Sequence, residues 1–151
     1  MGNRLMVLAL LVVFSSIRAQ SSFVVVEKSL PFNHWATSFT TDIIGVNESF
    51  VSKNWEKFIV DHGGEALLRS MVEGDVEYEC RQVKIPFLNN EEDTIYTRLS
   101  PNDSMTGVLL TIWIKRDDGT FYSAEKDPKS AEKVKTWLLL FNEKLQEASR
   151  G

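Results

Sequence analysis

The chain has 151 residues, of which 43% are hydrophobic and 25% are charged, a balance that suits one globular domain with a sizeable core. Its formal net charge is −4 and no basic run is longer than Lys115-Arg116, so it lacks the basic stripe typical of a nucleic-acid-binding protein. The single cysteine, Cys80, excludes a disulfide within the chain, so the fold must be stabilised by its apolar core.

Residues 1–19 have the features of a cleavable signal peptide. Arg4 supplies the positive charge, residues 5–14 are an unbroken apolar run, and the small residue Ala19 precedes the expected cut. The apolar run is too short to cross a bilayer, which takes about 20 apolar residues. We therefore expect a periplasmic or extracellular product, not membrane-spanning, with residues 20–151 forming a single domain.

The first elements after this leader are predicted to be strands. Residues 23–26 are β-branched or aromatic, which favours a strand that Pro31 and Asn33 then interrupt. Residues 35–44 favour a second strand, which ends at Gly45.

A helix is predicted next. Asn47 is a suitable N-cap residue, and apolar side chains recur at helical spacing from Phe50 to Ile59. The pair Gly63-Gly64 supplies the left-handed residue that closes such a helix.

The segment 66–124 predicts strands joined by turns. Apolar and polar residues alternate over residues 76–81, as in a strand with one buried face. Residues 108–114 are the most apolar, so we expect them to form a central strand. The remaining features of this segment are a polar loop at 89–93, a strand at 95–99, a hairpin turn at 117–119 and a short returning strand at 121–124.

A second helix closes the chain. Asp127 is a suitable cap, Pro128 suits the first helical position, and a broad apolar stripe runs from Ala131 to Ala148. Because turns rather than long crossovers join the strands, the sequence predicts an α+β fold. We expect a single antiparallel sheet of about five to seven strands with two helices packed on one face.

Few residues offer catalytic chemistry. Cys80 with His62 or His34 is the only thiol–base combination, but Cys80 lies on the apolar side of its strand, which is typical of a buried thiol. His62 follows the first helix, where it would serve as a cap. Glu77 and Glu79 share a strand face and could form a carboxylate pair, although the solvent face of a strand commonly carries such residues. We predict no catalytic residues.

The sequence predicts neither a metal site nor a cofactor. Two histidines and one cysteine, scattered along the chain, do not match the spacing of zinc ligands. Residues 102–107 have the rhythm of a calcium loop but lack its acids, and Trp113 stands where the bidentate glutamate belongs. Gly63-Gly64 lacks the lysine of a phosphate-binding loop.

Trp113 and Leu109 are the candidate binding residues. They lie on the opposite side of the central strand from Ile112 and Ile114, so helices on that other side would leave them free to form an apolar patch for a partner or ligand. The alternative is that residues 23–32 cover Trp113.

Several packing motifs together resemble small uncharacterised exported proteins of Bacteroidetes-type bacteria. They are the leader ending in Ala-Gln, the helix with Val51, Trp55 and Phe58, the strand 110–114, the turn to 121–123 and the closing helix. The resemblance implies an exported α+β domain and brings no functional residue with it. The single cysteine also favours a bacterial envelope protein over a disulfide-rich secreted one.

These observations favour a non-enzymatic exported domain that binds an envelope protein or a small apolar ligand, with no nucleic-acid partner. One alternative is a hydrolase with an unrecognised site. Another is a cystatin-like secreted inhibitor, since Gln82-Val83-Lys84-Ile85-Pro86 is similar to the Gln-x-Val-x-Gly hairpin of cystatins. Lys84 and Pro86 depart from that pattern.

Overall fold

The computed structural model describes residues 23–32, 34–86, 88 and 92–151. The predicted leader, Asn33 and residues 89–91 of the predicted loop lie outside this part of the chain. The eight elements are, in order, β1 (Val25–Phe32), β2 (His34–Ile44), α1 (Glu48–Asp61), β3 (Glu65–Val72), β4 (Asp75–Val83), β5 (Asp93–Pro101), β6 (Gly107–Lys115) and α2 (Pro128–Ser149).

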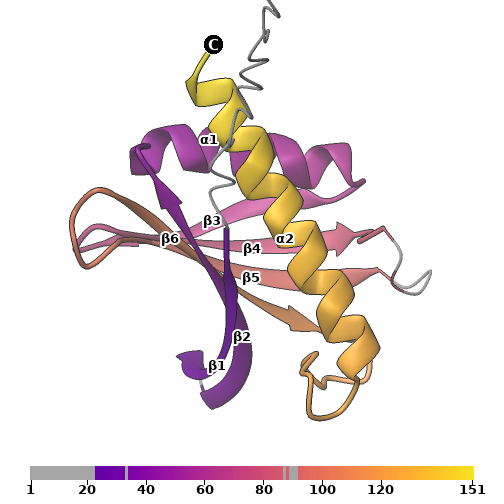
Figure 1. Ribbon diagram of the computed structural model, residues 1–151. Helices are drawn as coiled ribbons and strands as arrows, with labels where there is room; N and C mark the ends of the chain where they lie inside the picture. The colour runs from indigo at the N-terminus through magenta and orange to yellow at the C-terminus, as the bar shows by residue number, and fades with distance from the viewer. Residues whose placement is uncertain (1–22, 33, 87, 89–91) are drawn as a thin grey trace, which may run out of the picture.

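The strands form one six-stranded antiparallel sheet in the order β1-β2-β6-β5-β4-β3 (Figure 1). This confirms the predicted α+β class and the single antiparallel sheet. β6 lies inside the sheet, between β2 and β5, as its apolar sequence predicted. Its Leu110, Ile112 and Ile114 side chains are fully buried in the core.

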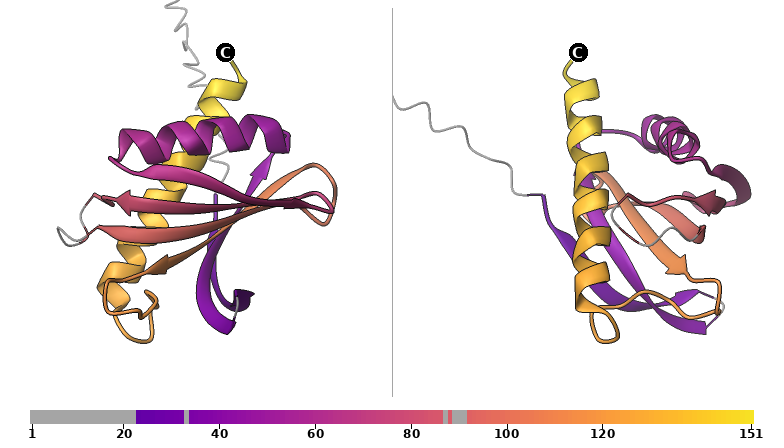
Figure 2. Two further views of the ribbon diagram at one scale, coloured as in Figure 1. Left: turned by 180° about the vertical axis from the view of Figure 1, so that it is seen from behind. Right: turned by 90° about the vertical axis from the view of Figure 1, so that its right-hand side faces the viewer.

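Both helices pack on the same face of the sheet. α1 lies over β3 to β6, α2 lies over β2 and β1, and the two helices cross (Figures 1 and 2). At the crossing, the Trp55 ring centroid lies 5.9 Å from that of Trp137 and 5.0 Å from that of Phe141. One continuous apolar core therefore joins the two helices to one side of the sheet, and no helix of the described residues lies on the other side, the helix-free face.

The helix boundaries follow the predicted signals. The side chain of Asn47 accepts a hydrogen bond from the Phe50 amide at 2.9 Å, and Gly63 adopts a φ of 77° after α1. Asp127 accepts from the Ser130 amide at 3.1 Å, and Pro128 is the first residue of α2. Capping satisfies amide groups that the first turn of a helix leaves unpaired.

The N-terminal strands differ from the prediction. β1 continues through Pro31, which stands opposite Trp35, and ends only at Phe32. A proline lacks the amide proton that a ladder needs, but β1 is the edge strand and needs amides on one side only. Pro31 is therefore part of the strand rather than its end.

The predicted return strand at residues 121–124 is reduced to one bridge between Lys115 and Phe121. The Tyr122 amide still donates to the Ile114 carbonyl at 3.1 Å. Beyond it, the chain turns towards α2, since the Asp127 amide donates to the Ser123 carbonyl. The start of α2 thus diverts the chain before a strand can form.

The β1–β2 hairpin curls over the helix-free face. Its end bends away from the plane of the other strands (Figures 1 and 2), and the Phe32 ring centroid lies 4.3 Å from that of Tyr96 on β5. On the helix side, Glu27 accepts a hydrogen bond from the Ala124 amide at 2.7 Å and faces Lys135 at 3.8 Å. The curl makes the helix-free face concave beside β1 and β2.

Candidate functional site

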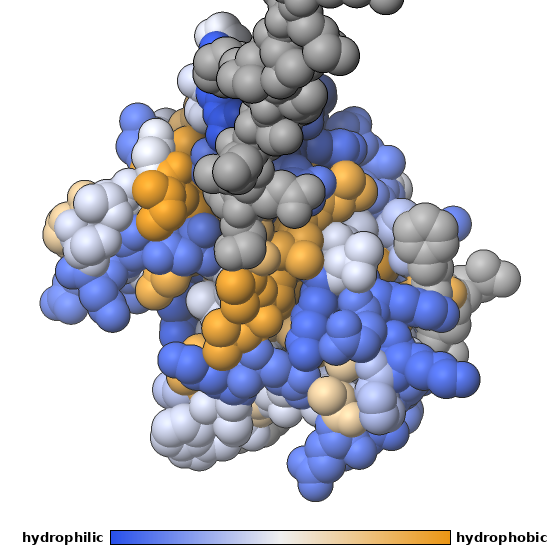
Figure 3. Space-filling model, in the orientation of Figure 1, coloured by the Kyte–Doolittle hydropathy of each residue, from blue (hydrophilic) through white to orange (hydrophobic). Residues whose placement is uncertain are grey.

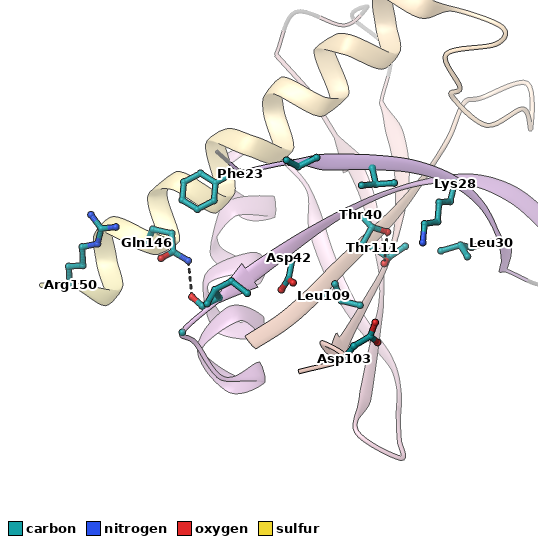
Figure 4. Close-up of a pocket in the computed structure, with 14 residues that line it drawn as sticks. Phe23, Lys28, Leu30, Thr40, Asp42, Asp103, Leu109, Thr111, Gln146 and Arg150 are labelled. Atoms are coloured by element: carbon teal, nitrogen blue, oxygen red, sulfur yellow. Dashed lines mark hydrogen bonds between the residues drawn. The ribbon is translucent and has the colours of Figure 1, made fainter. Parts of the chain in front are cut away.

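The concave face holds a hollow of about 900 Å³ (Figure 4). Ligand pockets in proteins are commonly 300–1,000 Å³ in volume, so this hollow could hold a small molecule. Its floor comes from β1, β2 and β6, and its far end from the last turns of α2. The lining residues are Phe23, Val24, Val26, Lys28, Leu30, Thr40, Asp42, Ile44, Gly45, Asp103, Leu109, Thr111, Gln146 and Arg150.

Most of the lining is apolar. Val24 is 62% exposed, Val26 is 43% exposed and Ile44 is 51% exposed, all unusual values for valine and isoleucine on a sheet face. Apolar surface is visible at the position of β1 in Figure 3. Exposed apolar surface gathered in one concave place is typical of an interaction site.

Strand pairing gives the hollow an apolar end and a polar end. Asp42 pairs with Leu109, and Ile44 pairs with Gly107, so Ile44 and Leu109 belong to one end. Thr40 pairs with Thr111 across the same two strands, and their hydroxyl oxygens lie 2.9 Å apart. Val26 stands opposite Thr40, and Lys28 lies two residue pairs further along β1, opposite Ser38, with its ammonium group pointing into the hollow toward Thr111 (Figure 4).

Two acids line the apolar end. Asp42 accepts a hydrogen bond from the Asn102 side-chain amide at 3.0 Å, and Asp103 follows in the turn between β5 and β6. Asn102 is buried and organises this turn, because its Oδ1 accepts from the Thr106 amide at 2.8 Å and from the Gly107 amide at 3.2 Å. The turn at residues 102–107 is thus held together by hydrogen bonds to the Asn102 side chain.

Of the two predicted binding residues, only Leu109 lines the hollow. Trp113 is 1% exposed, and the Phe32 ring lies over it with a centroid distance of 5.3 Å. The Arg98 guanidinium lies 5.2 Å from the Trp113 ring centroid. The alternative, in which residues 23–32 cover Trp113, is therefore correct. The prediction of an exposed apolar patch centred on Trp113 is wrong, because Phe32 buries this side chain.

Cys80 is fully buried, as expected for a structural thiol. Burial raises the pKa of the Cys80 thiol to about 11. Its sulfur contacts Thr97 Oγ1 at 3.9 Å, and Thr97 also accepts from the Trp55 indole at 3.1 Å. Cys80 therefore belongs to a core polar cluster that contains no base.

His62 caps α1 through its side chain. Trp137 Nε1 donates to His62 Nε2 at 3.2 Å, so Nε2 is an acceptor and Nδ1 carries the proton. Nδ1 then donates to the Phe58 carbonyl at 2.6 Å. Both ring nitrogens are engaged in hydrogen bonds, so His62 contributes to the end of α1, as the capping interpretation predicted. His34 is the first residue of β2, and its side chain lies outside the described part of the structure.

Glu77 and Glu79 do not form a carboxylate pair. Glu79 accepts from Arg81 at 2.6 Å and from Arg69 at 2.7 Å, whereas Glu77 faces Arg98 at 2.8 Å. The hydrogen bond from Arg81, with that from Arg69, lowers the pKa of Glu79. These carboxylates are held as ion pairs on the helix-free face, as the solvent-face interpretation predicted.

The segment similar to the cystatin hairpin faces the core. Val83 is fully buried and Ile85 is 3% exposed, so their side chains are not available to enter another protein. Gln82 has a φ of 57°, and the register of β4 against β5 shifts between Cys80 and Val83. The resemblance therefore covers a bulge in the sheet rather than a protruding hairpin.

A polar network that sequence analysis did not predict joins α1 to β4. Tyr78 donates to Glu56 Oε1 at 2.7 Å, and Ser52 donates to the Tyr78 oxygen. Burial of the phenol, with a further contribution from the Glu56 carboxylate, raises the pKa of Tyr78 to about 12. A phenol that holds its proton so firmly is not a catalytic base, so we assign the network to stability.

We expect Tyr78→Phe to lower the free energy of unfolding by about 1–2 kcal/mol at pH 7, because Ser52 and Glu56 lose their partner. The ordinary pKa of tyrosine is 10.0 and that of folded Tyr78 is about 12. Its stabilising contribution is therefore complete below pH 10 and is lost as the pH rises from 10 to 12. Within that window, the difference in free energy of unfolding between the wild type and Tyr78→Phe should decrease by up to about 1.4 kcal/mol per pH unit.

Urea unfolding of both proteins between pH 8 and 11.5 measures this difference. Cys80→Ala is the control, because loss of the thiol removes a contribution that declines from pH 9 to 11 instead. A difference between wild type and Tyr78→Phe that stays constant with pH would contradict the assignment.

Among the described residues, no three His, Cys, Asp or Glu side chains cluster to hold a metal ion. In the same part of the chain, neither helix is long and apolar enough to cross a membrane. Comparisons with protein-family models, curated proteins and solved structures found no match. The geometry of the hollow is therefore the basis for assigning a function.

Proposed function

We propose that this protein is a non-catalytic binding domain that takes a small apolar ligand in the hollow on its helix-free face. The observation that carries the proposal is the hollow itself, about 900 Å³ in volume, whose exposed lining is chiefly apolar and includes Val26, Ile44 and Leu109. Burying exposed apolar surface is favourable by about 25 cal/mol per Å², which is the driving force for such binding.

The chemistry of the surrounding residues supports binding over catalysis. Cys80 and His62 are the side chains whose chemistry would suit a nucleophile and a base. Both make structural contacts on the helix side of the sheet. The hollow itself presents carboxylates, an ammonium group, a guanidinium group, an amide and two hydroxyls that bond to each other. A hydrolase would need a nucleophile within reach of a base, so we place that alternative second.

We further propose that the protein acts outside the cytoplasm, in keeping with the leader predicted from residues 1–19. Protein recovered from the exported fraction of its host should begin at Gln20. This material is the right sample for binding measurements, because an uncleaved apolar run at 5–14 could itself compete for an apolar site.

The test uses N-phenyl-1-naphthylamine, a neutral apolar dye whose fluorescence rises in an apolar environment. We expect saturable binding by the wild type and at least about tenfold weaker binding by Leu109→Glu or Val26→Glu, because each places a charge in the hollow. Leu68→Glu is the matched control, since Leu68 is 54% exposed on β3 at the opposite edge of the sheet.

Equal dye binding by Leu109→Glu and Leu68→Glu would refute the proposal. Absence of binding by the folded wild type would do so as well, and would favour an envelope protein as the partner of this face.

A further inference from the structure

The hollow carries a charge pattern that its apolar lining does not explain. At the polar end, Lys28 has no carboxylate within ion-pair distance among the described residues. Near Leu109, Asp42 and Asp103 add two carboxylates, and Arg150 lies at the far end of the hollow beyond Gln146 (Figure 4). The end with Lys28 is therefore positive, and the stretch around Leu109 is negative.

Arg98 does not supply a second free cation. It lies beside Thr111 in the strand pairing, but its guanidinium bonds to Glu77 at 2.8 Å and lies over the Trp113 ring. In the part of the chain that the structure describes, Lys28 is then the free cation that points toward the hydroxyl pair (Figure 4). One ammonium group matches a singly charged anion better than a phosphate, which draws on several donors and is typically met by arginine forks.

The two threonine hydroxyls add a hydrogen-bond donor at the same place. Each hydroxyl has one proton, and the 2.9 Å contact between Thr40 and Thr111 uses only one of the two. The proton of the accepting hydroxyl remains available to a ligand. An ammonium group and a hydroxyl donor side by side form a suitable receptor for one carboxylate group.

The carboxylates of Asp42 and Asp103 set the direction of such a ligand. A carboxylate next to Asp42 or Asp103 would be repelled, whereas an alkyl chain there would contact Ile44, Leu109 and Phe23 without a charge conflict. Figure 4 shows Lys28 and Phe23 at opposite ends of the hollow. Head group and chain would therefore occupy different ends in one orientation.

We infer that the ligand of this hollow is a free long-chain carboxylate, with its head group on Lys28 and the Thr40–Thr111 pair and its chain along Leu109 towards Phe23. This inference rests on the proposed function, because it names the class of ligand that the same hollow takes.

The test compares dodecanoate with dodecanol, which has the same chain and no charge, by isothermal titration calorimetry. We expect the wild type to bind dodecanoate about tenfold more tightly than dodecanol. Lys28→Met keeps the aliphatic stem and should abolish that preference while leaving dodecanol affinity within about twofold. Lys53→Met, an exposed lysine on α1, should change neither affinity.

A second variant examines the hydroxyl pair. Thr111→Val has the shape of threonine without its hydroxyl, and it should reduce dodecanoate affinity about threefold and dodecanol affinity hardly at all. Raising the salt concentration from 0.05 to 0.5 M should weaken dodecanoate binding in the wild type and not in Lys28→Met, because salt screens a half-exposed ion pair.

The outcomes separate this inference from the proposed function. Equal affinity for both ligands, unchanged in Lys28→Met, would overturn the carboxylate assignment and leave the apolar hollow intact. Binding of neither ligand by the folded wild type would overturn both.

Two further results would identify a different occupant and overturn the inference. One is co-sedimentation with phosphatidylglycerol vesicles without binding of free dodecanoate, which would point to a membrane surface. The other is a dimer in sedimentation that Val26→Glu dissociates, which would make a second copy of the chain the occupant.

Discussion

Replacement of Trp55 by alanine is expected to lower the free energy of unfolding by about 3–5 kcal/mol, the cost typical of deleting a large buried aromatic side chain. Trp55 is fully buried where α1 meets α2 and the sheet, and it contacts the rings of Trp137 and Phe141. Its indole also donates to Thr97 on β5 at 3.1 Å, so the substitution leaves a buried hydroxyl without that donor.

Trp35 provides the matched control for this substitution. It is 71% exposed on β2, so Trp35→Ala should change the free energy of unfolding by less than about 0.5 kcal/mol. Urea unfolding followed by circular dichroism measures both variants without relying on tryptophan fluorescence. Similar losses for the two variants would show that Trp55 does not occupy the centre of the core.

Gly107→Ala should lower the free energy of unfolding about as much as Trp55→Ala does, for a different reason. A Cβ atom at this position would lie 2.1 Å from the Ile43 carbonyl oxygen and 2.9 Å from the Ile44 Cα, both backbone atoms of the neighbouring strand β2. Backbone in a paired strand cannot move aside as a flexible side chain can. We expect a loss of about 3 kcal/mol or more, since β2 and β6 must separate locally.

Gly119→Ala separates this clash from the general cost of replacing a glycine. Gly119 has a φ of 85° in the turn after β6, but no atom lies within 4 Å of a Cβ built there. Backbone strain alone should cost about 1 kcal/mol. If Gly107→Ala unfolds at the same urea concentration as Gly119→Ala, β2 and β6 do not approach each other as closely as described.

Local chemistry made most of the fold predictable from the sequence. Asn47 and Asp127 are cap residues whose function depends on three or four neighbouring positions, and both helices begin where they predict. The alternation through Val76, Tyr78 and Cys80 likewise fixed the buried face of β4. Such signals need no knowledge of distant parts of the chain.

The features that sequence analysis missed depend on distant contacts. Pro31 reads as a strand end, and only the position of β1 at the sheet edge makes it acceptable within the strand. The burial of Trp113 depends on Phe32, which is brought over it by the curl of the β1–β2 hairpin. No periodicity in residues 108–114 contains that information.

The candidate site was predictable only in part for the same reason. Leu109 could be assigned to the helix-free face by counting along its strand, and it does line the hollow. Lys28 offered no signal, because a lysine on an edge strand is a common solubility device. Its significance comes from pointing toward Thr111, which is far away in sequence and is brought to the same face of the sheet by the β1-β2-β6 order.

That strand order also governs when the fold can form. β2 must pair with β6, and Phe39 meets Ile112 only after the four intervening elements have been synthesised. Bringing such distant strands together carries a loop-closure cost that slows folding. Until β6 is present, β2 lacks its partner, and the sheet that joins the two halves of the chain cannot be completed. The topology thus delays completion of the sheet until the C-terminal third of the chain is present.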